Sequence, residues 1–139
     1  MEAGTHEFES HTSEVQIRIR ASTLPELFEE AGAALADVIL GEDHPAAPLD
    51  VEPEVIEVQA YDYEALLVDW LNELIYRSEV RKQVYTDVDV ESLTERGLRA
   101  RVRGFHPEEI KTAVKAATFH GLEIREHEDG FGATLVLDV

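Results

Sequence analysis

The sequence contains no cysteine among its 139 residues. Without thiols, the chain cannot form disulfides, thiolate zinc sites or iron–sulfur clusters, and it has no thiol nucleophile. No apolar stretch approaches the ~20 residues that a membrane-spanning helix needs. The N-terminal residues lack the basic start and the apolar core of a secretory signal. We therefore expect a cytoplasmic protein that makes no membrane contact.

Basic residues are also scarce. Twelve lysines and arginines stand against 30 aspartates and glutamates, which gives a formal net charge of −18. Such a chain repels polyanions, so we expect no strong direct binding to nucleic acid. An acidic surface suits solubility, cation binding or docking on a basic partner. The hydrophobic content of 44% is enough to bury one core, and the length predicts a single domain over residues 1–139.

The signatures of common active sites are missing as well. There is no glycine-rich phosphate loop, no HExxH metal helix and no GxSxG nucleophile turn. The six histidines are scattered along the chain, and none has a carboxylate at the spacing of a known metal motif. We interpret His120, on an apolar face of the 113–125 segment, as a hydrogen-bonded core residue and not as a ligand. The sequence therefore predicts no catalytic residue.

Hydrophobic periodicity predicts the secondary structure. Apolar residues at helical spacing predict helices at about 24–39 and 62–79, and Thr23 with Glu26 forms a capping box at the start of the first. Trp70 lies on the apolar stripe of the second helix and is expected in the core. Alternating apolar residues predict strands at 15–20, 55–60, 84–91, 98–103, 113–125 and 131–139. We expect an α+β fold of two layers, in which a largely antiparallel or mixed sheet carries two main helices on one face.

Two of these strands form a predicted hairpin with an unusual charge pattern. Acidic residues alternate with apolar ones in the first strand and arginines do so in the second, namely Asp87, Asp89 and Glu91, and Arg99, Arg101 and Arg103. In a hairpin the two rows lie side by side and form cross-strand ion pairs. An RNA-binding strip is the alternative, but we favour neutralisation of the arginines within the protein.

Two other acidic residues stand at strand ends. Glu14 opens the first predicted strand, and Asp138 lies one residue before Val139, the last residue of the sequence. If their strands are neighbours, the two carboxylates and the terminal carboxylate of Val139 can converge on a hard cation. Ligation by oxygen atoms alone suits calcium or magnesium. The residues by themselves do not establish that the strands are neighbours.

Four segments, in order along the chain, resemble the motifs of the archease family. HTSEVQI at 11–17 is similar to the family's HTADxGI opening, LLVDWLNELIY at 66–76 to its LLxxWLxELL helix, and VKAATFHGL at 114–122 to its VKAxTYHxL strand. The chain also ends, as archeases do, in an apolar–Asp–apolar tail. The resemblance covers essentially the whole chain.

This resemblance implies a function. Archeases are small acidic proteins that assist the RtcB-type RNA ligase, which joins a 3′-phosphate or 2′,3′-cyclic phosphate end to a 5′-hydroxyl with GTP and manganese. They speed formation of the covalent ligase–guanylate intermediate and permit multiple turnover, in tRNA splicing or RNA repair. The family thus implies a non-enzymatic protein cofactor. A stand-alone metal-dependent hydrolase and a chaperone-like acidic binding module are the competing interpretations.

The resemblance also implies a metal site. Family members bind a divalent ion, commonly calcium, through ligands that correspond to Glu14, Asp138 and Val139. This sequence has glutamate at position 14, where the family has aspartate, and Gln16, where the family has glycine. The flexible coordination shell of calcium accepts the longer side chain more readily than the octahedral shell of magnesium. We therefore expect a divalent cation, calcium in preference to magnesium, bound with modest affinity.

Overall fold

A computed structural model describes residues 4–10 and 13–139 of the chain. Its elements follow the order β1 (Gly4–Ser10), β2 (Glu14–Ala21), α1 (Leu24–Leu40), β3 (Glu54–Gln59), α2 (Tyr63–Val80), β4 (Val84–Thr94), β5 (Gly97–Phe105), β6 (Ala116–Thr118), β7 (Arg125–His127) and β8 (Gly130–Asp138). The described strands pair antiparallel throughout. The predicted α+β class, with two main helices and antiparallel pairing, is confirmed.

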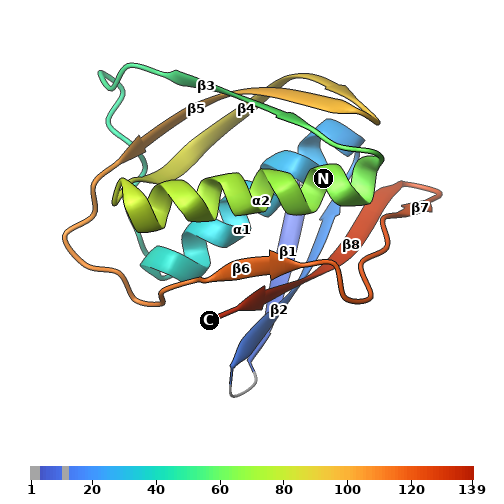
Figure 1. Ribbon diagram of the computed structural model, residues 1–139, viewed down its shortest axis with the longest axis horizontal. Coiled ribbons are helices and arrows are strands. Elements are labelled where there is room, and N and C mark those ends of the chain that lie inside the picture. The colour runs from blue at the N-terminus through green and yellow to red at the C-terminus, as the bar shows by residue number, and fades with distance from the viewer. Residues whose placement is uncertain (1–3, 11–12) are drawn as a thin grey trace.

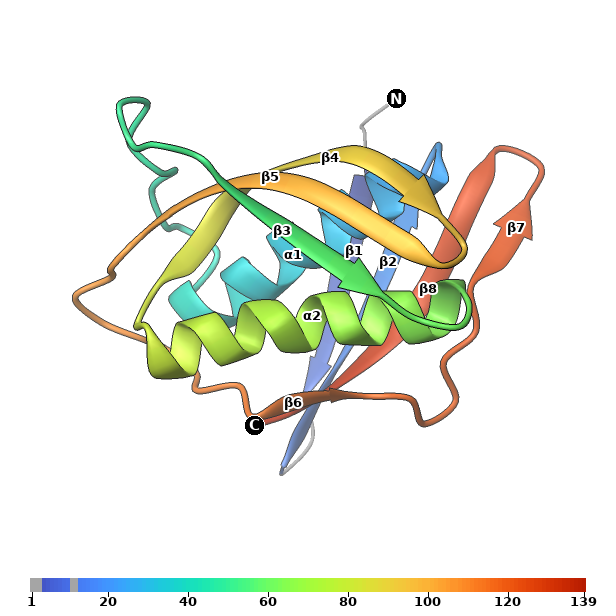
Figure 2. The same cartoon turned by 45° about the horizontal axis from the view of Figure 1, so that its top comes forward.

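The strands divide between two sheets. One has five strands in the order β1-β2-β8-β6, with β7 as a further partner of β8, and the other has three in the order β3-β5-β4. Helix α1 contacts β1, β2 and β8 of the first sheet and β4 of the second, and α2 contacts β6 and all three strands of the second. The helices therefore lie between the sheets (Figures 1 and 2). Each sheet carries helices on one face, as expected, but two sheets share them.

Both helices begin where the sequence predicts. The Thr23 side chain accepts a hydrogen bond from the Glu26 backbone N–H at 3.3 Å, and the Asp62 side chain accepts one from that of Ala65 at 2.8 Å. These caps satisfy backbone donors that the first helical turn leaves free. Helix α1 ends at Gly41, whose φ of 92° is open to glycine without strain. In the described part of the chain, neither helix has an apolar stretch long enough to cross a membrane.

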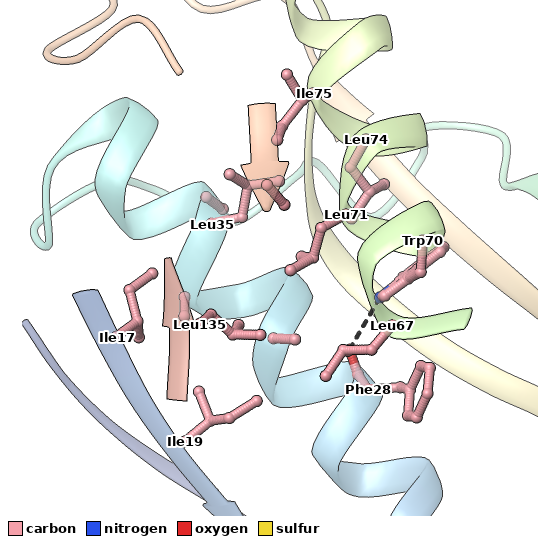
Figure 3. Packing of buried hydrophobic residues seen from close by; sticks show 14 of the residues in the cluster. Ile17, Ile19, Phe28, Leu35, Leu67, Trp70, Leu71, Leu74, Ile75 and Leu135 are labelled. Carbon is pink, nitrogen blue, oxygen red and sulfur yellow. Dashed lines mark hydrogen bonds between the residues drawn. The ribbon is translucent and has the colours of Figure 1, made fainter. Parts of the chain in front are cut away.

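The core fills the space between the helices and the two sheets. Trp70 and Phe28 are fully buried, and Leu67 beside them is buried too. The Trp70 indole N–H donates to the backbone carbonyl of Phe28 at 3.0 Å, which joins α2 to α1 (Figure 3). A buried indole N–H without a partner is costly. The prediction that Trp70 is a core residue is confirmed.

The predicted strand at 113–125 is wrong over most of its length. Only Ala116–Thr118 forms a strand, and Ala117, not its neighbours, is buried. The Leu122 N–H donates to the Phe119 carbonyl at 2.9 Å in a turn that contains Gly121 at a φ of 68°. This turn ends the strand, and beyond it Leu122 and Ile124 pack against the core without strand pairing. His120 is exposed, which corrects the core position expected for it.

Candidate metal centre

The strands β2 and β8 bring together two segments that lie far apart in the sequence. Their antiparallel register places Glu14, the first residue of β2, directly opposite Asp138, the last residue of β8. Directly opposed residues in such a ladder have their Cβ atoms ~5 Å apart and project their side chains from the same face. Ile17 and Leu137 are buried, whereas Asp138 is exposed and Glu14 is half-buried. The two carboxylates thus lie on the outer face of the five-stranded sheet.

Backbone hydrogen bonds hold the end of the chain on both sides. The Val139 N–H donates to the carbonyl of Ser13 at 3.1 Å, next to Glu14. On the opposite side, the Lys115 N–H donates to the carbonyl of Asp138 at 2.7 Å, and Ala116 of β6 pairs with Asp138. Asp138 therefore lies between β2 and β6, and Val139 follows at the same corner of the sheet. His11 and Thr12 of the opening motif lie outside the described residues.

The charges at this corner are alike. Like charges directly opposite in an antiparallel pair repel, and neither Glu14 nor Asp138 forms an ion pair within residues 4–10 and 13–139. In the same part of the chain no group of three histidine, cysteine, aspartate or glutamate side chains stands at metal-binding spacing. A cation at this corner therefore needs further oxygen ligands, such as an oxygen atom of Val139 or water. The donors are all hard oxygen atoms, which suits calcium.

A second cluster of titratable groups lies half-buried between β1 and α1. The His6 ring contacts the carboxylate of Glu30 through Nδ1 and that of Asp37 through Nε2, the latter at 2.8 Å. His44 contacts the other oxygen of Asp37 at 2.7 Å. Burial alone would lower the pKa of His6, but the hydrogen bonds and charges of Glu30 and Asp37 outweigh it and raise the pKa. The cluster fixes β1 and the loop after α1 to the helix.

Sequence reasoning missed this cluster. Strand β1 carries polar residues at most positions of GTHEFES, so alternation does not reveal it, and it is an edge strand paired only with β2. The available signal was a histidine before the first predicted strand and another after the first helix. Both rings contact carboxylates or a backbone carbonyl and no hydroxyl group. The geometry therefore describes a structural ion cluster and offers no activated nucleophile.

The arginine row of the three-stranded sheet is neutralised in part as predicted: Arg99 and Arg101 pair with acids, Glu91 among them, whereas Arg103 donates to the backbone carbonyl of Val51 at 3.1 Å. Arg99 pairs with Glu57 of β3 at 2.8 Å and with Glu91 at 3.2 Å, and Arg101 pairs with the other oxygen of Glu91 at 3.2 Å. An irregularity between Val90 and Ser92 takes Glu91 out of the regular register. Bulged residues are re-aimed in this way. Asp89 lies opposite Arg101 in the ladder without forming an ion pair.

Fold and site together define a small acidic α+β protein in which two antiparallel sheets enclose two helices. Glu14 and Asp138 lie opposite each other where β2 pairs with β8, and neither forms an ion pair within the described residues. The sequence model of the Archease protein family (MTH1598/TM1083) matches residues 6–139. The chain belongs to the archease family.

Relatives named "Protein archease" match over almost their whole length. The one from Methanosarcina mazei is 32% identical over 142 residues, which cover 96% of this chain and 95% of the relative. The one from Pyrococcus furiosus is 36% identical over 137 residues, covering 93% and 94%. The predicted family resemblance is confirmed.

Two solved structures share the fold. The solution structure of Methanobacterium thermoautotrophicum protein 1598 has a TM-score of 0.74 at 25% identity and covers 100% of both chains. The crystal structure of a Thermotoga maritima protein, described as an archease and possible chaperone, has a TM-score of 0.64 at 21% identity and covers 97% of this chain and 98% of that one.

Proposed function

We propose that this protein is a non-enzymatic accessory factor that activates an RtcB-type, GTP-dependent RNA ligase in tRNA splicing or RNA repair. It promotes guanylylation of the ligase and multiple turnover. The observation that carries the proposal is the register of Glu14 with Asp138, because it brings together two carboxylates that the archease resemblance names as metal ligands. The family match over residues 6–139 supports the same function.

The proposed site holds a divalent cation, calcium in preference to magnesium, between Glu14, Asp138 and Val139. The donor set fits such an ion, because both side chains are carboxylates on one face and no protein cation neutralises them within the described chain. A bound calcium ion supplies positive charge and coordination positions that oxygen atoms of a partner can occupy. The chain's own contribution is to hold the two carboxylates opposite each other at an accessible corner.

The charge of the protein supports docking on a ligase. With a net charge of −18, this chain is attracted to a partner whose RNA groove is basic. The same charge opposes strong direct binding to RNA. We therefore propose the ligase, and not its RNA substrate, as the binding partner. Attraction of this kind acts mainly on the association rate and weakens with salt.

A turnover assay tests the proposal. RtcB-type ligase is supplied at a concentration well below that of an RNA with a 3′-phosphate and a 5′-hydroxyl end, with GTP and manganese. This protein is expected to restore repeated rounds of ligation and to show no ligase, nuclease or nucleotidyl-transfer activity alone. RNA or GTP turnover without ligase, following this protein through purification, would instead establish the stand-alone hydrolase.

The Thermotoga maritima relative, described as a possible chaperone, favours a second candidate, a chaperone-like binding module. That function predicts suppressed aggregation of unrelated unfolded proteins together with no change in the number of ligation rounds. The same preparation of protein serves both assays. Ligase stimulation without an effect on aggregation supports the accessory factor, and the reverse result supports the chaperone.

A further inference from the structure

The short strand β6 has one strand neighbour and one side-chain neighbour. It pairs with β8 on one edge. On its other edge the Asn72 amide, from α2, accepts a hydrogen bond from the Ala117 N–H at 2.8 Å and donates one to the Ala117 carbonyl at 3.2 Å. The two contacts fix which end of the amide is oxygen, because one backbone group donates and the other accepts. Asn72 therefore takes the place of a missing strand.

This pair of hydrogen bonds lies next to the corner that holds Asp138. Ala117 pairs with Leu137, and Ala116 pairs with Asp138. The Lys115 N–H, just before β6, donates to the Asp138 carbonyl at 2.7 Å. With only three residues, β6 has little pairing of its own to hold it in place. The contact from α2 thus positions the strand that in turn holds Asp138 from the side opposite Glu14.

We propose that Asn72 is a positioning residue for the Glu14–Asp138–Val139 site, an inference that rests on the function proposed for that site. Asn72 lies on the edge of β6 that faces away from Asp138, and it does not belong to the ligand set. It acts by locking β6, and through β6 the last two residues, in the register that aligns the carboxylates. Glu64, two turns earlier on α2, accepts from the Ile124 N–H at 3.1 Å and holds the segment after β6 in the same way.

Two substitutions of Asn72 separate the effect of losing both hydrogen bonds from the effect of losing the donor alone. Asn72→Ala removes both hydrogen bonds, so the buried N–H and carbonyl of Ala117 lose their partner. Asn72→Asp keeps the shape and the acceptor but places a carboxylate oxygen against the Ala117 carbonyl. If Asn72→Ala does not fold, Asn72→Asp carries the test. Tyr76→Ala is the control, because Tyr76 lies one turn further on α2, is 53% exposed and makes no hydrogen bond in the described structure.

The first measurement is amide hydrogen exchange without metal. We expect the Lys115 and Val139 amides to exchange on the order of 10-fold faster in the Asn72 variants, with no change in the three-stranded sheet or in Tyr76→Ala. Unchanged exchange at Lys115 and Val139 overturns the inference. Equal acceleration throughout both sheets also overturns it, because Asn72 then supports general stability only.

The second measurement is calcium binding by calorimetry. We expect the Asn72 variants to bind about 10-fold more weakly than the unmodified protein and Tyr76→Ala to bind equally, since groups that orient ligands contribute on that scale. Equal affinity in all variants contradicts the inference. If the unmodified protein binds no calcium, the proposed metal is wrong, and hydrogen exchange alone decides whether Asn72 holds the end of β8.

Discussion

The outer faces of the two sheets differ in how their charged side chains are paired. On the three-stranded sheet, Arg99 and Arg101 share Glu91, and Arg99 also pairs with Glu57. At the corner of the five-stranded sheet, Glu14 and Asp138 lie opposite each other and have no cationic partner within the described chain. Both arrangements consist of charges on the outer face of neighbouring antiparallel strands. The sign of the neighbouring charge distinguishes them: an arginine faces an acid on one sheet, and an acid faces an acid on the other.

This contrast separates a structural charge from one available for binding. Exposed ion pairs that are satisfied within the chain contribute little to stability and leave nothing for a partner to bind. Two opposed carboxylates without a cation lower stability, and that loss is recovered when a cation binds. The acidic corner is therefore the better candidate for a binding site. Substitutions at the acidic corner should therefore change function, whereas substitutions in the charged rows of the three-stranded sheet should change stability.

The largest expected effect follows from Asp138→Ala. Removing this carboxylate should abolish ligase stimulation and weaken calcium binding by at least ~10-fold, because even groups that only orient a ligand contribute that much. The fold should stay intact, since the Asp138 side chain is exposed. Ligation assays, calorimetry and circular dichroism measure the three quantities.

Asp89→Ala is the matched control for that variant. Asp89 is also an exposed acid at a paired position of a sheet and forms no ion pair in the described structure. It lies on the three-stranded sheet, so both stimulation and calcium binding should survive. Full stimulation by Asp138→Ala, together with no calcium binding by the unmodified protein, would remove the metal from the mechanism.

Calcium should stabilise the unmodified protein more than the Asp138→Ala variant. A ligand that binds only the folded state adds about 2.7 kcal/mol to the free energy of unfolding at 100 times its Kd. Thermal melts with and without excess calcium measure this difference, and magnesium at the same concentration should give a smaller shift. An equal rise in melting temperature for Asp138→Ala would show that calcium binds elsewhere in the molecule.

Arg101→Glu should lower stability modestly and leave function unchanged. The substitution replaces a partner of Glu91 by a third acid beside Asp89 and Glu91, so the melting temperature should fall by a few degrees. Ligase stimulation should stay the same, because Arg101 belongs to the charge row that the protein neutralises itself. If stimulation disappears while the melting temperature does not change, the arginine row is a partner surface.

The sequence predicts the charged hairpin better than the acidic corner, because the hairpin pairs residues that are close along the chain and the corner does not. The β4–β5 hairpin joins residues that are close along the chain, and alternation with a turn reveals it. The bulge that re-aims Glu91 cannot be predicted in this way, since a bulge has no periodic signature in the sequence. By contrast, Glu14 and Asp138 meet across nearly the whole chain. Periodicity shows that each lies at a strand end, but only the resemblance to a family suggested that the ends are neighbours.

The periodicity of the sequence does not predict the division of the strands into two sheets either. Caps at Thr23 and Asp62 and the spacing of apolar residues predict both helices to within about two residues. Apolar residues surround much of α2, which indicates burial on more than one side, yet alternation in a strand cannot show which sheet the strand joins. The Asn72 contact with Ala117 depends on that tertiary arrangement. A polar residue within an apolar helix was the available signal.

The smallest expected effect concerns the acid dependence of the neutralised face. Hydrogen bonding from Arg101, followed by its charge and the contacts of Arg99, lowers the pKa of Glu91 below its ordinary value. A carboxylate whose pKa is lower in the folded state binds fewer protons than in the unfolded state, so it contributes stability at neutral pH. That contribution is present above the ordinary carboxyl pKa of the unfolded chain and disappears as the pH falls through the lowered folded-state pKa. We therefore expect unmodified protein to melt slightly above Glu91→Gln at pH 7 and the difference to vanish in strong acid. A difference that stays constant between pH 7 and pH 3 would mean that Glu91 acts through shape and not through charge.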